Sequence, residues 1–220
     1  MRSRLPMIAV LPLVCGLIAA CGDDDSDEPE VELPEGCERV SEPQPKQADL
    51  SKPRDLQPPP AGTVAVVDTS CGSFEIELDT RSSPKTTASF ANLVEEAVYD
   101  GTGFHRIVPD FVIQGGDPRG DGTGDPGYFV DEPPPGRVAY TRGTVAMAKT
   151  EVEPPGRSGS QFFVVVAADA GLPADFALLG EVGTGLDVVE RIAELGDPAT
   201  GQSGAPLAPV VIDSITLERR

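Results

Sequence analysis

The stretch FHRIVPDFVIQGGD, from Phe104 to Asp117, gathers residue types that can act on a bound molecule. It contains the only histidine of the chain, His105, with Arg106 beside it and Gln114 further along. An arginine is permanently charged and offers five N–H donors in one plane, so it can stabilise electron density that develops during a reaction. These residues are the first candidates for a functional site.

Several common catalytic sites are excluded by the residue pattern. With one histidine, the chain cannot form an HExxH motif or a histidine–cysteine zinc cluster. GRSGS at 156–160 departs from the GxSxG nucleophile motif in its last residue. The glycines of 115–124 lack the lysine of a phosphate-binding loop, and the aspartates among them are not spaced as Ca²⁺ ligands. We therefore expect no metal and no cofactor.

The net charge of the chain argues against one class of binding partner. Its 220 residues carry a formal net charge of −19, and no Lys/Arg-rich run interrupts the acidic balance. Since binding to nucleic acid depends on neutralising phosphates, we expect no nucleic-acid partner. The length allows one sizeable domain with an appendage.

Residues 1–20 have the anatomy of a secretory signal peptide. Arg2 and Arg4 precede an apolar run that is short for a membrane-spanning helix, which needs about 20 residues. The ending LIAAC resembles a bacterial lipobox, in which Cys21 would receive a diacylglyceryl group and become the first mature residue. An ordinary cleaved signal peptide is the alternative. We expect an extracytoplasmic protein, lipid-anchored to a bacterial membrane.

Residues 21–60 differ in composition from the rest of the chain. They contain an acidic run from Asp23 to Glu35 and eight prolines that end in PPP at 58–60. Because such a segment has little apolar surface to offset its ordering entropy, we predict a disordered, extended tether. In polyproline form it could reach on the order of 100 Å. The folded domain is then expected over 61–220.

Four cysteines remain to be assigned. Cys15 leaves with the signal peptide and Cys21 is the expected lipid site, which leaves Cys37 and Cys71. Disulfides persist outside the cytoplasm, so we predict that these two pair, with two free thiols as the alternative.

The remaining chain shows strand-like patterning with few helices. Strands are expected at 63–70, 73–78, 104–108, 111–115, 144–148, 160–166, 177–182 and 210–218. One helix should span 83–98, with Ser83 as N-cap, Pro84 in the first position and a core face of Phe90, Leu93, Val94, Ala97 and Val98; a second should span 186–195. The pattern predicts a mainly β fold: a closed, eight-stranded antiparallel barrel capped by two α-helices.

Three motifs carry a family resemblance. FHRIVPDFVIQGGD, GTVAMAKT at 143–150 and SGSQFFV at 158–164 follow one another in an order and spacing that resemble the cyclophilin-type peptidyl-prolyl isomerases, particularly their short bacterial branch. The resemblance covers about residues 62–218. It implies cofactor-independent cis/trans isomerisation of X-Pro bonds, here in proteins folding outside the cytoplasmic membrane.

The resemblance also implies roles for individual residues. Arg106 would contact the X-Pro amide and Gln114 would orient it, whereas His105 would be structural. Phe111, Phe163 and Leu172 would form the pocket for the proline ring, with Phe162 turned into the core. The other implied substrate-binding residues are Val112, Ala148, Lys149, Gln161 and Phe176. Val112 replaces a methionine of the best-known members, and Phe176 replaces a histidine of the eukaryotic branch.

One alternative function uses the same groove. A non-catalytic adaptor on the cell envelope could bind proline-containing peptides without isomerising them. Such an adaptor could dispense with the arginine, so the presence of Arg106 and Gln114 favours the enzyme. We expect it to act on proline-containing polypeptides as a monomer.

Overall fold

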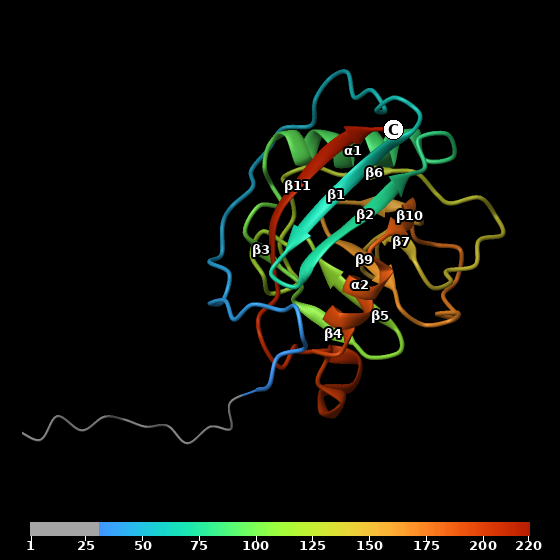
Figure 1. Cartoon of the computed structure of the whole chain (residues 1–220). Coiled ribbons are helices and arrows are strands. Elements are labelled where there is room, and N and C mark those ends of the chain that lie inside the picture. The colour runs from blue at the N-terminus through green and yellow to red at the C-terminus, as the bar shows by residue number, and fades with distance from the viewer. Residues whose placement is uncertain (1–30) are drawn as a thin grey trace, which may run out of the picture. The chain divides into compact units, whose positions relative to one another are not determined.

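A curled sheet of antiparallel strands forms the body of the protein (Figure 1). The computed structural model describes residues 31–220; the expected signal peptide at 1–20 and the lipid site Cys21 lie outside the described residues. The large sheet contains nine strands: β1 (Thr63–Thr69), β2 (Gly72–Leu78), β3 (Thr102–Gly103), β4 (Arg106–Val108), β5 (Val112–Gly115), β7 (Thr144–Met147), β9 (Phe162–Val165), β10 (Leu178–Thr184) and β11 (Val211–Arg219). Two short strands, β6 (Val130–Asp131) and β8 (Arg157–Ser158), form a separate pair.

The first two strands follow the alternation expected from their sequence. Val67 and Phe74 are opposite each other in β1 and β2, and both side chains are buried. The turn between these strands requires Gly72, whose φ is +109°. The predicted hairpin is therefore confirmed.

The first helix is shorter than predicted. Helix α1 (Pro84–Glu95) begins at the expected proline, but Ser83 makes no side-chain cap bond. Glu132 caps the helix instead: its carboxylate accepts hydrogen bonds from the backbone amides of Lys85 and Thr86. The chain leaves the helix before Ala97, which has a φ of +52° and is exposed, so its assignment to the core face was wrong. Helix α2 (Leu186–Ala193) lies within its predicted range.

The sheet does not close into the predicted eight-stranded barrel. Its order is β3-β11-β1-β2-β10-β7-β9-β5-β4, with β3 and β4 at the two ends and no ladder between them. The free edge of β4 is occupied by the segment that contains the 3₁₀ helix η1 (Pro198–Ser203), since the Ile107 amide donates to the Gly204 carbonyl over 2.7 Å. Gly103 of β3 pairs with Asp117, beyond β5, through an isolated bridge, so the two ends of the sheet meet without a continuous ladder.

Two apolar clusters lie on the two faces of the sheet. The larger fills the concave interior and includes Phe162, which is fully buried. The smaller contains Val112, Tyr140, Ala146, Phe163 and Val165. Alternation along β9 thus turns Phe162 into the core and Phe163 to the other face, as predicted.

Residues 31–60, here called the strap, contact the sheet although they contain no helix or strand. Val31, Leu33, Cys37, Ala48, Leu50 and Leu56 pack against the main core. Backbone amides of the strap donate to the body of the protein, among them Lys46 to Pro118 and Leu50 to Pro126, each over 2.9 Å. In Figure 1 the strap runs along one side of the sheet to the edge near α1. The part of the expected tether that the structure describes is therefore ordered on the domain.

Covalent and charged contacts hold the strap in place. Cys37 and Cys71 form the predicted disulfide, which links the strap to the turn between β1 and β2. The Lys46 ammonium donates to the Ala97 and Asp100 carbonyls beyond α1. Burial lowers the pKa of Lys46 from its ordinary value of 10.5. None of the helices within 31–220 has the length and apolarity needed to cross a membrane.

Candidate active site

The strand register places the main candidate residues in one row. Arg106 on β4 is opposite Gln114 on β5, Gln114 is opposite Phe163 on β9, and Phe163 is opposite Ala146 on β7. Residues directly opposite in an antiparallel sheet share a face. Segments far apart in sequence thus bring an arginine, a glutamine and an aromatic ring together.

The Arg106 guanidinium is half-buried and held by several contacts. Its Nη1 donates to Gln114 Oε1 over 3.3 Å, and its Nε donates to the Gln202 carbonyl oxygen over 2.9 Å. Its Cζ lies 5.7 Å from the centre of the Phe111 ring. Burial lowers the pKa of Arg106 from its ordinary value, but a guanidinium remains charged at physiological pH.

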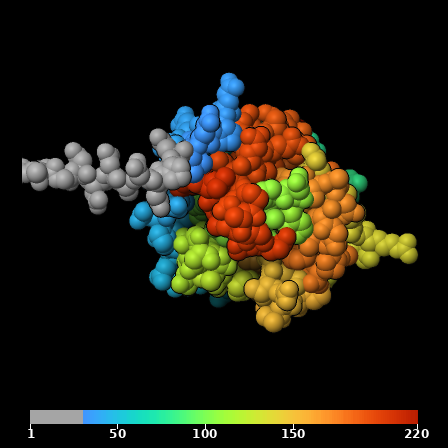
Figure 2. Space-filling view, turned by 90° about the horizontal axis from the view of Figure 1, so that it is seen from below, coloured from blue at the N-terminus to red at the C-terminus, as the bar shows by residue number. Residues whose placement is uncertain are grey.

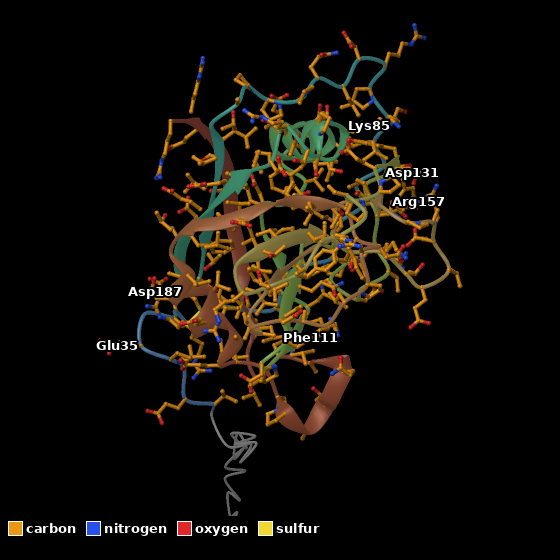
Figure 3. All side chains as sticks on the ribbon, turned by 90° about the vertical axis from the view of Figure 1, so that its right-hand side faces the viewer. Glu35, Lys85, Phe111, Asp131, Arg157 and Asp187 are labelled. Atoms are coloured by element: carbon orange, nitrogen blue, oxygen red, sulfur yellow. A yellow bond between two sulfur atoms is a disulfide. The ribbon has the colours of Figure 1, made fainter. Side chains whose placement is uncertain are left out.

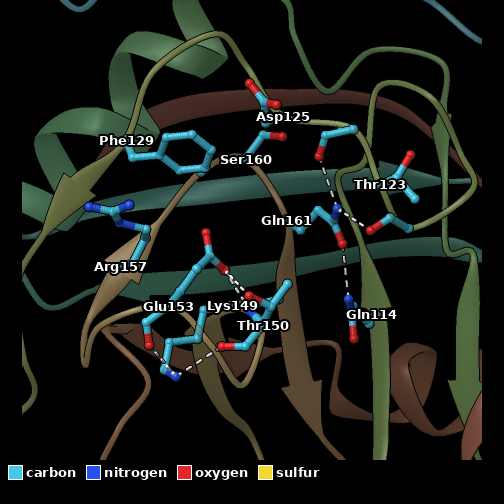
Figure 4. Close-up of a pocket in the computed structure, with 14 residues that line it drawn as sticks. Gln114, Thr123, Asp125, Phe129, Lys149, Thr150, Glu153, Arg157, Ser160 and Gln161 are labelled. Carbon is cyan, nitrogen blue, oxygen red and sulfur yellow. Dashed lines mark hydrogen bonds between the residues drawn. The ribbon is translucent and has the colours of Figure 1, made fainter.

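Gln114 belongs to a chain of amide contacts. Its Nε2 donates to Gln161 Oε1 over 3.0 Å, and Gln161 Nε2 donates to the carbonyls of Gly122 and Gly124 (Figure 4). These bonds define which end of the Gln114 amide faces Arg106. The loop 122–124 thereby fixes the acceptor that holds the arginine.

A pocket of about 340 Å³ opens beside this row. It is lined by Arg106, Phe111, Val112, Gln114, Ala148, Lys149, Phe163, Leu172, Phe176 and Gln202. The pocket therefore brings together all but one of the residues predicted for catalysis and substrate binding. The exception, Gln161, lines a neighbouring cavity of about 440 Å³ instead. The pocket can take a small apolar ring and present the guanidinium to it.

Lys149 forms part of the wall shared by the two cavities. Its side chain is only 3% exposed and its ammonium pairs with Asp175 over 2.6 Å. The ammonium also donates to the Thr150 and Glu153 carbonyls (Figure 4) and lies 5.5 Å from the centre of the Phe176 ring. The lysine side chain thus ties the loop after β7 to the segment that carries Phe176.

The neighbouring cavity is bounded by a second fixed arginine. Arg157 makes two hydrogen bonds to the Asp131 carboxylate, and the two side chains lie close together in Figure 3. Arg157 also stacks over Phe129 at 5.5 Å. The pKa of Asp131 is lowered chiefly by this hydrogen bonding. The bonds to Asp131 thus hold Arg157 in place at the wall of this cavity.

His105 lies behind the row and does not line the active-site pocket. Its Nε2 is 3.5 Å from Gln114 Nε2, and its Nδ1 is buried. Burial is the main reason that its pKa falls below the ordinary value of 6.5, although Asp117 opposes this shift. A neutral imidazole is the form that can accept from the Gln114 amide, in agreement with a structural role.

Gln202 was missed by the sequence analysis. It belongs to η1 and is exposed, yet it lines the pocket and contacts Arg106 twice. Figure 2 shows the red atoms of the chain near residue 200 packed beside the green atoms near residue 110. A polar residue in a glycine-rich segment gives no signal of such a contact. No group of three or more His, Cys, Asp or Glu residues in the described chain could hold a metal ion.

Comparisons with known proteins agree with this fold. The family model "cyclophilin type peptidyl-prolyl cis-trans isomerase/CLD" matches residues 64–217. The chain is 38% identical to peptidyl-prolyl cis-trans isomerase B of Streptomyces anulatus, over 71% of this chain and 97% of the relative. It is 32% identical to a probable peptidyl-prolyl cis-trans isomerase B of Mycobacterium tuberculosis, over 87% and 67% of the two chains.

A solved structure shows the same likeness. The cyclophilin type isomerase of Cryptosporidium parvum, determined in the presence of the dipeptide Ala-Pro, superposes with a TM-score of 0.63 at 28% identity and covers 71% of this chain and 99% of its own. This chain belongs to the cyclophilin-type peptidyl-prolyl cis-trans isomerase family. It is a cofactor-independent isomerase with a mainly β cyclophilin fold.

Proposed function

We propose that this isomerase catalyses cis/trans isomerisation of X-Pro bonds in proteins that fold outside the cytoplasmic membrane, and that a lipid on Cys21 holds it there. The observation that carries the catalytic part is the Arg106 guanidinium, held by Gln114 at the wall of an apolar pocket. Uncatalysed isomerisation takes tens to hundreds of seconds, which is slow enough to limit folding.

The chemistry requires no persistent bond to break. The barrier, about 18–20 kcal/mol, arises from loss of amide resonance as the C–N bond twists. The prolyl nitrogen then regains its lone pair and can accept a hydrogen bond from Arg106. This bond is stronger in the twisted state than in either planar state, so it lowers the barrier. If the site removes about 7 kcal/mol, the rate rises about 10⁵-fold.

The apolar part of the pocket provides the binding surface for proline. Phe163 is a buried member of the smaller apolar cluster, and Phe111 and Leu172 pack against that cluster while remaining partly exposed. A proline ring placed against these three side chains brings its nitrogen to the arginine side of the pocket. The Ala-Pro dipeptide named for the related structure supports this choice of substrate.

Two observations support the extracytoplasmic location. The Cys37–Cys71 disulfide fits an oxidising compartment. The N-terminal sequence has the order of charged, apolar and small residues that precedes a lipidated cysteine. The domain acts on its clients as a monomer, which light scattering of the purified protein would test.

Lipidation can be tested by metabolic labelling. Bacteria that express the full chain are fed an alkyne-tagged palmitate, and wild type is compared with Cys21→Ala and the matched control Cys15→Ala. We expect label and membrane association in wild type and in Cys15→Ala, and loss of both in Cys21→Ala. Labelled Cys21→Ala, or an unlabelled wild type, would contradict the proposal.

A further inference from the structure

We infer that Gln202 is a second positioning residue for Arg106, which acts together with Gln114 and contributes to the catalysed rate more than to peptide affinity. The inference rests on the proposed role of Arg106. Gln202 lies in η1, 96 residues after Arg106 in the sequence, and lines the same pocket.

The contacts to Arg106 use each guanidinium nitrogen once. Nε donates to the Gln202 carbonyl oxygen over 2.9 Å, and Nη2 donates to Gln202 Oε1 over 3.4 Å. Nη1 donates to Gln114 Oε1 over 3.3 Å. A guanidinium has five N–H groups and these contacts use three, so one N–H on Nη1 and one on Nη2 remain available to a substrate. The two glutamines can hold the group while its reactive donors remain available.

The backbone of η1 is shaped to present Gln202. Gly201 has φ +56° and ψ −130°, a conformation that only glycine adopts without strain. On the other side, Gly204 has φ +65°, and its carbonyl accepts from the Ile107 amide over 2.7 Å. The segment is therefore attached to β4 beside Arg106, and the turn at Gly201 sets the direction of the next carbonyl.

Positioning of this kind affects rate more than binding. An unheld arginine side chain samples many rotamers, and only a fraction would bring the guanidinium to the prolyl nitrogen. Acceptors that fix it before the peptide arrives raise that fraction, although they add little contact with the planar ground state. The expected signature is a lower catalysed rate at nearly unchanged peptide affinity.

The side-chain contact is tested with Gln202→Ala, Gln202→Glu and the control Ser203→Ala in the full chain. Ser203 lies in the same 3₁₀ helix, and its hydroxyl donates to Thr200 rather than to Arg106. NMR exchange spectroscopy on a short Ala-Pro-Phe peptide measures affinity and catalysed rate separately. We expect a three- to tenfold lower rate in Gln202→Ala, less than a twofold change in affinity, and wild-type behaviour in Ser203→Ala.

Gln202→Glu separates a positioning role from a general effect on the loop. A carboxylate keeps the acceptor that Arg106 Nη2 uses, so this variant should recover at least half of the lost rate. The inference is wrong if Gln202→Ala retains the wild-type rate, if Gln202→Glu is as slow as Gln202→Ala, or if Ser203→Ala loses as much as Gln202→Ala.

The backbone contact needs a different variant, because Gln202→Ala leaves the carbonyl in place. In Gly201→Ala the Cβ would strain this backbone conformation, although it meets no atom within 4 Å, so the turn should rotate and displace both Gln202 acceptors. Gly101→Ala is the matched control, with φ +70° and equally open surroundings. We expect a larger rate loss in Gly201→Ala than in Gln202→Ala, and none in Gly101→Ala. Equal rates in the two glycine variants would overturn the backbone role.

A measurement without substrate separates this inference from the proposed function. Side-chain NMR of Arg106, assigned by the loss of its signals in Arg106→Lys, reports rotation of the guanidinium about its Nε–Cζ bond. We expect slow rotation in wild type and faster rotation in Gln202→Ala. Unchanged rotation would refute the contact even in an active enzyme. An inactive wild type with slow rotation would refute the proposed function and leave the contact standing.

Discussion

Arg106 and Gln114 are directly opposite each other on β4 and β5, and the guanidinium donates to the glutamine oxygen over 3.3 Å. The amide of Gln114 cannot turn over freely, because its nitrogen donates to Gln161. An arginine held by an oriented acceptor is ready for the twisted amide before the peptide binds.

Replacement of Gln114 should therefore lower the rate without removing activity. We expect Gln114→Ala to reduce kcat/KM about tenfold, a loss of about 1.4 kcal/mol in transition-state stabilisation, because Gln202 still holds Arg106. Gln114→Glu keeps an acceptor for the guanidinium and should lose less. A protease-coupled isomerisation assay measures both, and equal losses in the two variants would show that the acceptor is not what matters.

The buried His105 should make stability depend on pH. Its pKa in the folded state lies below the ordinary value of 6.5, so between these two values the unfolded chain binds a proton that the folded chain does not. Stability from the neutral imidazole is thus present above pH 6.5 and is lost as the pH falls toward the folded pKa. Urea unfolding of wild type and His105→Gln at pH 7.5 and 5.5 tests this: wild type should lose more stability on acidification, and equal losses would contradict it.

The disulfide should stabilise the fold without affecting catalysis. Cys37 and Cys71 are separated by 34 residues in the sequence, a loop whose closure contributes up to about 4 kcal/mol through the unfolded state. The double variant Cys37→Ser/Cys71→Ser should unfold at a clearly lower urea concentration. Its kcat/KM should stay within twofold of wild type, since no strap residue lines the active-site pocket. Unfolding that does not change with the variant or with reductant would disprove the prediction.

The ion pair between Lys149 and Asp175 should contribute unequally to stability when one or the other partner is replaced. Asp175→Asn leaves the ammonium of Lys149 buried without its counterion, and such losses cost about 3 kcal/mol. Lys149→Met removes the buried charge and keeps the apolar stem of the side chain. The Asp175 carboxylate that it leaves unpaired is more exposed to water, so Lys149→Met should cost less stability than Asp175→Asn. Thermal unfolding followed by circular dichroism ranks the variants, and a larger loss in Lys149→Met would reverse the argument.

Part of the site has a local geometry, although its residues were expected from the resemblance of three motifs to the cyclophilin-type isomerases. Arg106 and Gln114 are eight residues apart, and the turn at Asp110, with φ +56°, fixes the register between their strands. Phe163 joins them from β9, much later in the sequence; alternation predicts that it and Phe162 face opposite ways, and the resemblance assigned Phe163 to this face. Short-range pattern explains how Arg106 and Gln114 come to face each other, whereas their roles and the place of Phe163 were implied by the family resemblance.

Contacts between distant segments could not be predicted in this way. The composition of the strap predicted disorder, but its few apolar residues reach the core and the disulfide shortens the loop that they close. Gln202 contacts Arg106 from a segment with no hydrophobic pattern. The same segment occupies the edge of β4, and the sheet has no ladder between β3 and β4, so the closed barrel was a wrong prediction.

The central claim is tested most directly with Arg106→Ala and Arg106→Lys in the full chain, by NMR exchange on an Ala-Pro-Phe peptide. Wild type should accelerate isomerisation strongly. Arg106→Ala should lower kcat/KM by at least tenfold, equal to about 1.4 kcal/mol, with a smaller change in peptide affinity. Arg106→Lys should also be slow, because a lysine lacks the planar donor group. A folded Arg106→Ala protein with the wild-type rate would contradict the account.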